Sequence, residues 1–144
     1  MKVIKLDTIT TTLPKNLKDI LKKININEQG IIFIIDEDSK LIGSISDGDI
    51  RRKILEGNKI NEQVNFKSSL VNKNFVSAKY NSSIKQITAK FDKEINGKII
   101  KCLPLIDDKG RIIDFATKER IKSFPISNLK INDEAINNVL EALS

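Results

Sequence analysis

The stretch IIFIIDEDSKLIGSISDGDIRR, residues Ile31 to Arg52, decides the fold because its pattern occurs twice in the chain. The second copy, CLPLIDDKGRIIDFATKERIKS, runs from Cys102 to Ser123, at a constant offset of 71 residues that aligns Ser46 with Thr117. Each copy reads as an apolar strand, an acidic turn, a second apolar strand and a hydroxyl residue that opens a helix. Two copies of one unit predict a pseudo-symmetric molecule, with ligands expected in the cleft between the copies.

Each copy is preceded by a further strand and an amphipathic helix, so that both halves have the order β-α-β-β-α. The predicted elements are strands at 2–10, 31–35, 41–45, 75–79, 99–106 and 111–116, and helices at 15–24, 47–55, 83–91 and 118–123. This order predicts the α+β class. We expect a first unit at 1–57, a polar linker at 58–74, a second unit at 75–123 and a C-terminal tail at 124–144.

The composition indicates a folded chain with no membrane or secretory signal. A chain of 144 residues with 40% hydrophobic residues can bury a core and corresponds to one domain or two small intertwined units. The longest apolar run, Ile31 to Ile35, is too short to span a bilayer, and the start MKVIKLDTIT lacks the apolar stretch of a signal peptide. With a single cysteine there is no disulfide framework, so we expect a cytoplasmic protein.

The net charge of +6 does not point to nucleic acid. Lysines are scattered among isoleucine and asparagine, and aromatic residues make up 5% of the chain, which is sparse for stacking on bases. Arginine, which binds phosphate through two hydrogen bonds, is rare. Four of the 25 basic residues are arginine, namely Arg51, Arg52, Arg111 and Arg120. We therefore expect neither a nucleic-acid nor a membrane partner.

Three short runs carry a resemblance to a known family: Ile34-Ile35-Asp36, Leu41 to Ser46, and Asp49-Ile50. Residues 30–52 resemble a CBS domain, and the chain to about residue 123 resembles a tandem CBS pair, or Bateman module. The resemblance implies two β-α-β-β-α units packed through their sheets about a pseudo-twofold axis, and a homodimer. The run DGDIRR at 47–52 is similar to CBS modules attached to bacterial sugar-phosphate enzymes, such as sugar nucleotidyltransferases and arabinose-phosphate isomerases.

The tail, Phe124 to Ser144, resembles the opening of DegT-type sugar aminotransferases, pyridoxal-phosphate enzymes of surface-polysaccharide synthesis. The similarity covers about 21 residues, and the pyridoxal-binding lysine and the rest of such an enzyme are absent from the sequence. An apolar helical stripe in the tail has nothing obvious to cover it, which suggests a chain cut from a longer protein. The stripe consists of Ile136, Val139, Leu140 and Leu143.

Ser46-Asp47-Gly48-Asp49 is the sharpest candidate site. Resemblance to CBS pairs implies that Ser46 and Asp49 contact the phosphate and ribose of an adenine nucleotide (AMP, ADP or ATP). A hydroxyl at a helix N-terminus can donate to phosphate, a carboxylate can accept from ribose hydroxyls, and Gly48 would let the backbone approach closely. The alternative is a helix cap, with Ser46 as N-cap and Asp49 at the third helical position, which needs no ligand.

The second copy departs from this pattern. Thr117 keeps the hydroxyl, whereas Arg120 replaces the aspartate and Asp114 replaces Gly43. An arginine cannot accept a hydrogen bond from ribose. It could pair with a phosphate, with Glu119, or with a partner chain, and we favour a surface role. The sequence therefore predicts one functional cleft and one degenerate cleft.

Two further groups are weaker candidates for ligand contact. Arg51, with Arg52 and Lys53 behind it, could neutralise phosphate at the cleft mouth, or could form a solvated helix face. Ile31 and Ile32, which follow Gly30, could form an apolar slot for the base, or could be core strand residues. In both cases we favour the structural interpretation.

Other chemistry is not supported by the residues present. The acidic turn at 36–38 lacks the glycine and glutamate of a calcium loop. Asp47 and Asp49 diverge at a helix start, and the chain has no histidine to act with them. Cys102 has no second thiol or histidine with which to bind a metal, so no metal site and no catalytic residue is predicted.

These features lead to one main hypothesis and two alternatives. The main one is a non-catalytic regulatory sensor that binds an adenine nucleotide and modulates an attached or associated sugar-modifying enzyme of surface-polysaccharide synthesis. The first alternative is a ligand-free dimerisation or scaffold module, which the altered second copy favours. The second alternative, an enzyme in its own right, is disfavoured because no activated nucleophile or acid–base pair is present.

Overall fold

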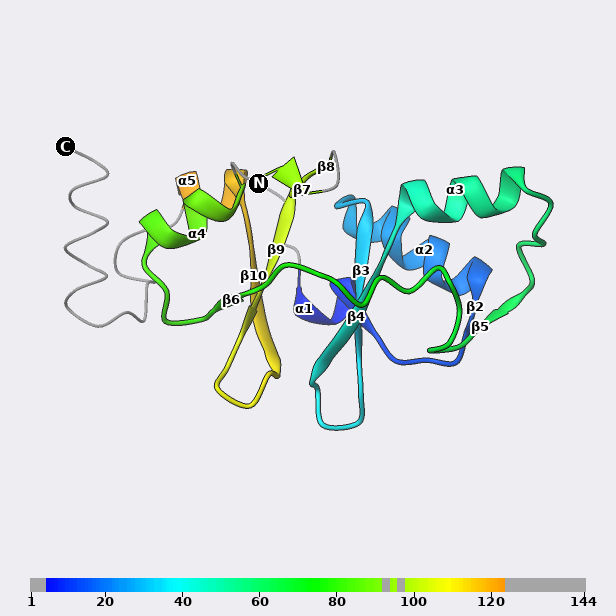
Figure 1. Cartoon of the computed structure of the whole chain (residues 1–144), viewed down its shortest axis with the longest axis horizontal. Coiled ribbons are helices and arrows are strands. Elements are labelled where there is room, and N and C mark those ends of the chain that lie inside the picture. The colour runs from blue at the N-terminus through cyan, green and yellow to red at the C-terminus, as the bar shows by residue number, and fades with distance from the viewer. Residues whose placement is uncertain (1–4, 92–93, 96–97, 124–144) are drawn as a thin grey trace. The chain divides into compact units, whose positions relative to one another are not determined.

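The computed structural model describes residues 5–91, 94–95 and 98–123 (Figure 1). They fall into two compact units: unit 1 holds residues 5–75 and 109–112, and unit 2 holds residues 76–108 and 113–123. The elements are, in chain order, α1 (Leu6–Ile9), β1 (Thr10–Thr11), β2 (Lys15–Asn16), α2 (Leu17–Asn27), β3 (Ile31–Ile35), β4 (Leu41–Ser46), α3 (Asp47–Leu55), β5 (Gln63–Val64), β6 (Ala78–Lys79), α4 (Ile84–Phe91), β7 (Glu94–Ile95), β8 (Lys98–Ile99), β9 (Cys102–Ile106), β10 (Ile112–Thr117) and α5 (Lys118–Ser123). The α+β class is confirmed, and each unit contains the predicted β-α-β-β-α order.

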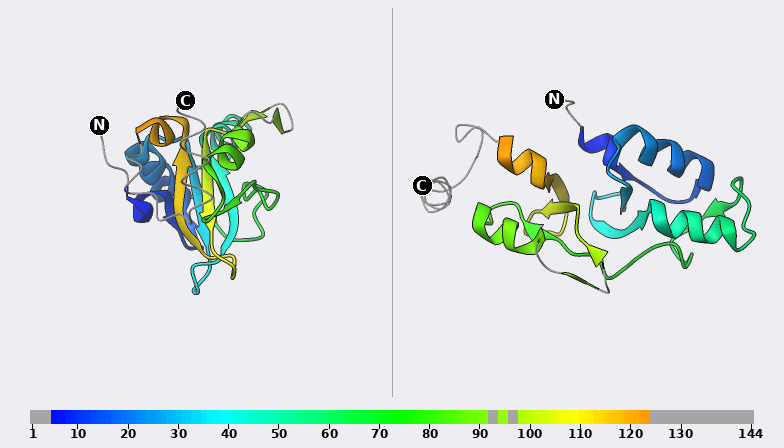
Figure 2. Two further views of the ribbon diagram at one scale, coloured as in Figure 1. Left: turned by 90° about the vertical axis from the view of Figure 1, so that its left-hand side faces the viewer. Right: turned by 90° about the horizontal axis from the view of Figure 1, so that it is seen from above.

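Unit 1 is built on a three-stranded sheet in the order β1-β3-β4. Strand β1 is parallel to β3, with Thr10 opposite Phe33, and β3 is antiparallel to β4, with Ile32 opposite Ile45. The central strand β3 is buried on both faces, as its uninterrupted apolar sequence predicts. Helices α2 and α3 run side by side next to this sheet (Figure 2).

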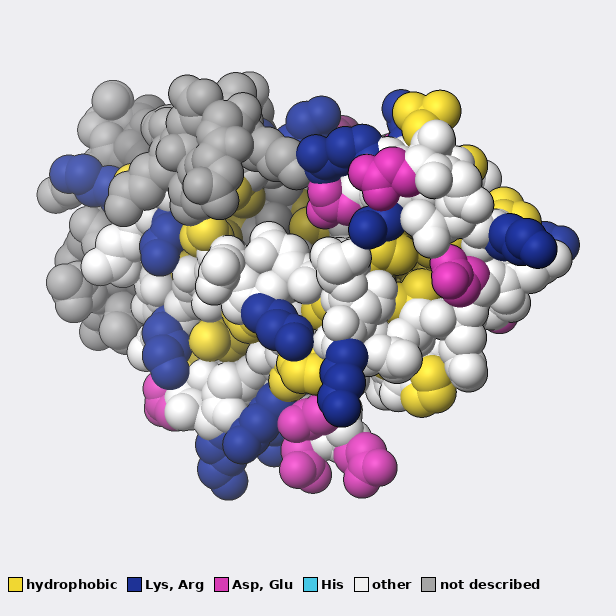
Figure 3. Space-filling view, turned by 45° about the vertical axis from the view of Figure 1, so that its right-hand side comes forward, with side chains coloured by type: hydrophobic (Ala, Val, Ile, Leu, Met, Phe, Trp, Pro, Cys, Tyr) yellow, Lys and Arg dark blue, Asp and Glu magenta, His cyan; other side chains and the backbone are white. Residues whose placement is uncertain are grey.

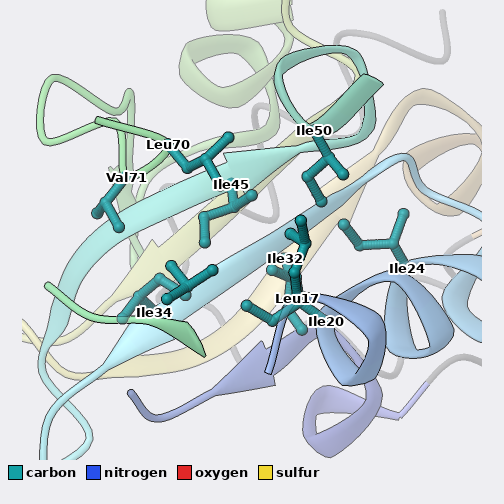
Figure 4. Close-up of a cluster of buried hydrophobic side chains, with 10 residues drawn as sticks. Leu17, Ile20, Ile24, Ile32, Ile34, Ile45, Ile50, Leu70 and Val71 are labelled. Atoms are coloured by element: carbon teal, nitrogen blue, oxygen red, sulfur yellow. The ribbon is translucent and has the colours of Figure 1, made fainter. Parts of the chain in front are cut away.

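The core of unit 1 joins these helices to the sheet (Figure 4). Leu17, Ile20 and Ile24 of α2 lie at helical spacing and pack in one cluster with Ile32 and Ile45 of the two strands. The other buried members of this cluster are Ile34, Ile50, Val64, Leu70 and Val71. Burial of this contiguous apolar surface is the main force that holds α3, and therefore the candidate site, against the sheet.

The segment predicted as a linker, 58–74, contributes to unit 1. Strand β5 within it pairs antiparallel with β2, with Val64 opposite Lys15. Three of its apolar residues, Val64, Leu70 and Val71, are buried in the unit 1 core. Further along, the backbone of Asn72 exchanges hydrogen bonds of 2.8 and 3.0 Å with Ser44 of β4. The isolated apolar residues of this polar stretch therefore act as anchors.

The start of the chain differs from the prediction. A strand was expected over 2–10, but residues 6–9 form the single turn α1, and only Thr10–Thr11 form a strand; residues 1–4 lie outside the described part. The hydroxyls of Thr8 and Thr10 donate to the carbonyls of Lys5 and Leu6, at 2.6 and 3.1 Å, which favours a turn over extended backbone. Helix α2 also begins at Leu17 rather than at residue 15.

Unit 2 has a similar architecture. Its sheet has the strand order β10-β9-β6, and β6 is parallel to β9. Its buried core consists of Ala78, Ile87, Phe91, Leu103, Leu105 and Ala116. A small antiparallel pair, β7–β8, precedes β9, and Asn96 and Gly97 between its two strands lie outside the described residues. The tail at 124–144, with its apolar stripe, also lies outside them. None of the helices formed by the described residues is long and apolar enough to cross a membrane.

Gly43 of β4 lies under the segment that follows β5, and this contact gives a testable prediction. A Cβ atom added at Gly43 would lie 2.5 Å from Val71 Cγ1 and 3.3 Å from the Asn72 carbonyl oxygen. Gly43→Ala should therefore lower the free energy of unfolding by about 1–3 kcal/mol in chemical denaturation. The matched control is Gly48→Ala, because a Cβ there meets nothing within 4 Å. Equal stabilities of Gly43→Ala and the wild type would contradict this packing.

Candidate functional site

The candidate site lies where β4 ends and α3 begins. Ser46 is the N-cap of α3, with φ −97° and ψ 153°, and its Oγ accepts a hydrogen bond from the Asp49 backbone N–H at 3.2 Å. The same Oγ donates to Asp49 Oδ2 at 2.8 Å. The helix cap expected as the alternative is therefore present. It also places a hydroxyl and a carboxylate, three residues apart in sequence, side by side.

The strand pairing brings a predicted neighbour to this pair. Ile31, the first residue of β3, lies opposite Ser46 in the antiparallel register, and its side chain is half-buried. The backbone N–H of Asp47 donates to the Gly30 carbonyl at 2.8 Å, which fixes the start of α3 against the start of β3. Gly30 has φ +73°, a conformation that glycine adopts readily. Ser46, Asp47, Asp49 and Ile31 thus converge at one end of the sheet.

Ile32, the other residue predicted to contact a base, is fully buried in the unit 1 core. Its side chain contributes to the packing of α2 against the sheet and not to the surface around Ser46. Ile32 is therefore a core residue of its strand, as the structural interpretation expected. Ile31 and Ile32 differ in burial because successive side chains of a strand point to opposite faces.

Both acidic residues of the α3 start pair with arginines of the same helix. Arg51 Nη2 lies 2.5 Å from Asp47 Oδ2, and Arg52 Nη2 donates to Asp49 Oδ1. The arginine side chains are 73% and 59% exposed, so each pair is at the surface and contributes about 0–1 kcal/mol. The acids lie in the first turn of α3 and one arginine in the last, an arrangement that the helix dipole favours.

Gly48 lies between the two acids on the first turn of α3 and is exposed. Space is open beside it, since an added Cβ would meet no heavy atom within 4 Å. An incoming group could therefore approach the helix N-terminus at this position. Together, the donor Ser46 Oγ–H, the carboxylate of Asp49 and the helix start can hold a diol and a nearby anion.

The equivalent position of unit 2 has the cap without the carboxylate. Thr117 Oγ1 accepts from the Arg120 backbone N–H at 3.0 Å, as Ser46 does from Asp49. The Arg120 guanidinium donates to Asp114 Oδ1 at 3.0 Å and to the Phe115 carbonyl at 2.6 Å. It also lies over the Phe115 ring, 4.3 Å from the ring centre. Arg120 therefore occupies the place where unit 1 offers an acceptor.

Sequence reasoning missed the partner of Arg120. We considered phosphate, Glu119 and a partner chain, whereas the structure pairs Arg120 with Asp114. One signal was available in the sequence: Asp114 and Arg120 are the two positions at which the second copy departs from Gly43 and Asp49 of the first. Two departures of opposite charge on adjoining elements indicate an ion pair.

Cys102 is buried in unit 2. Burial raises the pKa of its thiol to about 12, and the positive charge of Arg120 opposes that rise only in part. The thiol is therefore protonated at physiological pH, and the thiolate is the reactive form. Cys102 acts as a core residue of β9.

Charges on the face shown in Figure 3 are mixed. On this face, lysine and arginine side chains lie among acidic and uncharged ones.

Parts of this chain match a family model and a curated protein. Residues 7–56 match the family model of the CBS domain. The homoserine O-acetyltransferase of Methanococcus vannielii is 33% identical over 90 residues, which cover 62% of this chain. The chain spans only 17% of the length of that curated relative.

Solved structures of similar fold include CBS domain pairs. The CBS domain pair of protein MJ0100, in complex with 5′-methylthioadenosine and S-adenosyl-L-methionine, has a TM-score of 0.62 and 22% identity, and the match covers 83% of this chain and 97% of that chain. An acetoin utilization protein (AcuB) from Vibrio cholerae has a TM-score of 0.66 and 17% identity, with coverage of 100% and 98%. Residues 7–56 are therefore similar to a CBS domain, and the chain has the fold seen in a CBS domain pair.

Proposed function

We propose that this chain is a non-catalytic regulatory module whose unit 1 binds an adenine nucleotide at the start of α3. The observation that carries the proposal is the pairing of Ser46 Oγ with the Asp49 carboxylate at 2.8 Å, beside Ile31 and the open space at Gly48. In the proposed complex, Asp49 accepts from the ribose hydroxyls and Ser46 donates toward the phosphate. Arg51 lies on the same helix and adds positive charge near the anion.

One structural neighbour supports a ligand that contains adenosine. The MJ0100 domain pair holds 5′-methylthioadenosine and S-adenosyl-L-methionine. Because identity is low, this likeness establishes the fold alone, and the transfer of an adenosine ligand to unit 1 is our inference from the Ser46–Asp49 pair.

We expect one nucleotide per chain. In unit 2, Arg120 is held by Asp114 and the Phe115 carbonyl, and it presents donors where ribose needs an acceptor. Thr117 could still donate a hydrogen bond, but its hydroxyl caps α5 and is buried. Unit 2 is therefore assigned a structural role.

The proposed output is regulation of an enzyme. Occupancy of unit 1 would bias the conformation of the module and so the activity of an attached or associated enzyme. The match to a much longer homoserine O-acetyltransferase supports attachment to a metabolic enzyme. The resemblance of the tail supports a sugar-modifying enzyme of surface-polysaccharide synthesis, and this finer assignment remains our hypothesis.

Thermal unfolding with nucleotides tests the proposal. A ligand that binds only the folded state raises the melting temperature, and at 100 times its dissociation constant it adds about 2.7 kcal/mol of stability. We expect AMP, ADP, ATP or S-adenosylmethionine at millimolar concentration to raise Tm by several degrees. Guanosine and cytidine nucleotides serve as controls for nonspecific effects. Unchanged Tm with all four adenosine compounds would contradict nucleotide binding.

Self-association without a ligand is the second candidate function. Large apolar side chains are exposed at and beyond the end of α3, including Leu55 at 86% and Ile60 at 44%. An apolar surface of this kind favours association with a second copy. A dimer in sedimentation experiments that persists at low concentration, with no response to nucleotide, would favour the scaffold function over the sensor function.

A further inference from the structure

We propose that Arg52 changes partners when the site is occupied: it leaves the Asp49 carboxylate and binds the phosphate of the ligand. The site would then select phosphorylated adenine nucleotides over uncharged adenosine compounds. This inference rests on the proposed function, and it names the class of ligand and the residue that selects it.

The contacts of Asp49 favour such an exchange. Its Oδ2 accepts from Ser46 Oγ at 2.8 Å, and its Oδ1 is the acceptor for Arg52 Nη2. A ribose diol that donates both of its hydroxyls to a carboxylate needs both oxygens. In this conformation Arg52 lies against Oδ1 and therefore competes with a ribose hydroxyl for that oxygen.

The displacement of Arg52 is inexpensive. Its side chain is 59% exposed and that of Asp49 is 28% exposed, so water screens the pair and can solvate the released guanidinium. Exposed pairs three or four residues apart on a helix are weak. Competition by Arg52 should reduce the affinity for an uncharged nucleoside by no more than about fivefold.

The charge of the ligand decides what happens to Arg52 next. In the present structure Asp49 and Arg52 neutralise each other. An uncharged nucleoside would take the carboxylate and leave the guanidinium without an anion. A nucleotide brings the diol and the phosphate together, so it supplies a new anion to the arginine in the same step. Guanidinium and phosphate form two parallel hydrogen bonds, which are stronger than those between neutral groups.

Arg51 is the obvious competitor for this role, and its contacts distinguish it from Arg52. It is paired with Asp47 at 2.5 Å, and Asp47 is not the ribose acceptor of the proposed complex. Ribose binding therefore leaves the Arg51–Asp47 pair in place, whereas it breaks the Arg52–Asp49 pair. Only Arg52 is released by the ligand itself.

Calorimetric titration of the full chain with adenosine and with AMP, at one fixed low salt concentration, tests the exchange. We expect the wild type to bind AMP about tenfold or more tightly than adenosine. Arg52→Ala should lose most of this ratio while its affinity for adenosine stays the same or rises up to about fivefold. Arg52→Lys keeps the charge without the two parallel hydrogen bonds and should retain part of the ratio.

The control is Arg111→Ala, which removes the same charge at the turn before β10 and should keep the wild-type ratio. An unchanged ratio in Arg52→Ala would overturn the exchange while leaving nucleotide binding intact. Loss of the ratio in Arg51→Ala, with Arg52→Ala unaffected, would also overturn it and would assign the phosphate to Arg51. If the wild type binds neither ligand, the proposed function itself fails, and the exchange fails with it.

Discussion

Asp49→Ala should weaken the binding of adenine nucleotides by about 10- to 100-fold, because it removes the acceptor for the ribose hydroxyls. A hydrogen bond to a charged group contributes about 1.5–3 kcal/mol, and the carboxylate is expected to accept two of them. Part of this loss is offset, because the wild-type carboxylate must first give up its contacts with Ser46 and Arg52. Calorimetric titration of both proteins with AMP measures the difference directly.

The matched control for this variant is Asp19→Ala. Asp19 is the third residue of α2, as Asp49 is the third residue of α3, and its side chain is exposed. Both substitutions remove an acid that the helix N-terminus favours, so they share the same effect on the helix dipole. Only Asp49→Ala should change nucleotide affinity. Equal affinities of Asp49→Ala and the wild type would show that Asp49 has only a capping role.

Ile45→Ala should lower the free energy of unfolding by about 2–5 kcal/mol, the largest stability change that we expect from a single core substitution in β4. Ile45 is completely buried and lies opposite Ile32 in the unit 1 core (Figure 4). Truncation removes favourable burial and leaves a cavity among branched side chains that are held by α2 and α3. Denaturant unfolding, followed by circular dichroism, measures this loss.

Ile26→Ala is the control for the loss of apolar volume. Ile26 lies on α2 with 58% of its surface exposed, so the same truncation should change stability by less than about 1 kcal/mol. A similar loss in both variants would mean that the side chain of Ile45 is not in a packed core. The two variants together therefore test whether the β3–β4 hairpin is the centre of unit 1.

The hairpin and the helix that follows it could be predicted from sequence because their signals are local. An uninterrupted run of five apolar residues marks β3, and a hydroxyl residue before an acid-rich turn marks α3, whose bounds match the prediction. The acidic turn also has a local cause. Asp36 Oδ1 accepts from the backbone N–H groups of Asp38 and Lys40, both at 2.9 Å, and so closes the turn.

Features that depend on contacts distant in sequence could not be predicted in the same way. The pairing of the Asn72 backbone with Ser44, and the close approach of Val71 to Gly43, bring a polar stretch onto β4. The sequence of that stretch carries no periodic pattern that indicates its partner. The hypothesis of an apolar slot for the base needs Ile32 to be accessible, but Ile32 is buried. Its burial depends on which face of β3 packs against α2.

The candidate site was predictable in its composition and not in its internal contacts. Ser46 and Asp49 stand out as a hydroxyl and an acid at a helix start, and the structure brings them within hydrogen-bond distance. In the structure Asp49 contacts both Ser46 and Arg52. These contacts depend on side-chain conformation, which the motif does not specify. The contact between Arg52 and Asp49 is the reason why Arg52, rather than Arg51, is assigned the role of selecting the ligand.

The central claim is that an adenine nucleotide binds at the start of α3 in unit 1. Two-dimensional ¹⁵N–¹H correlation spectra of the labelled chain, recorded during titration with AMP, test it most directly. We predict saturable shifts of the Ser46, Gly48 and Asp49 amides, and little change at Thr117 and Arg120. Shifts that are largest at Thr117 and Arg120, or the absence of any saturable shift at the start of α3, would contradict the claim.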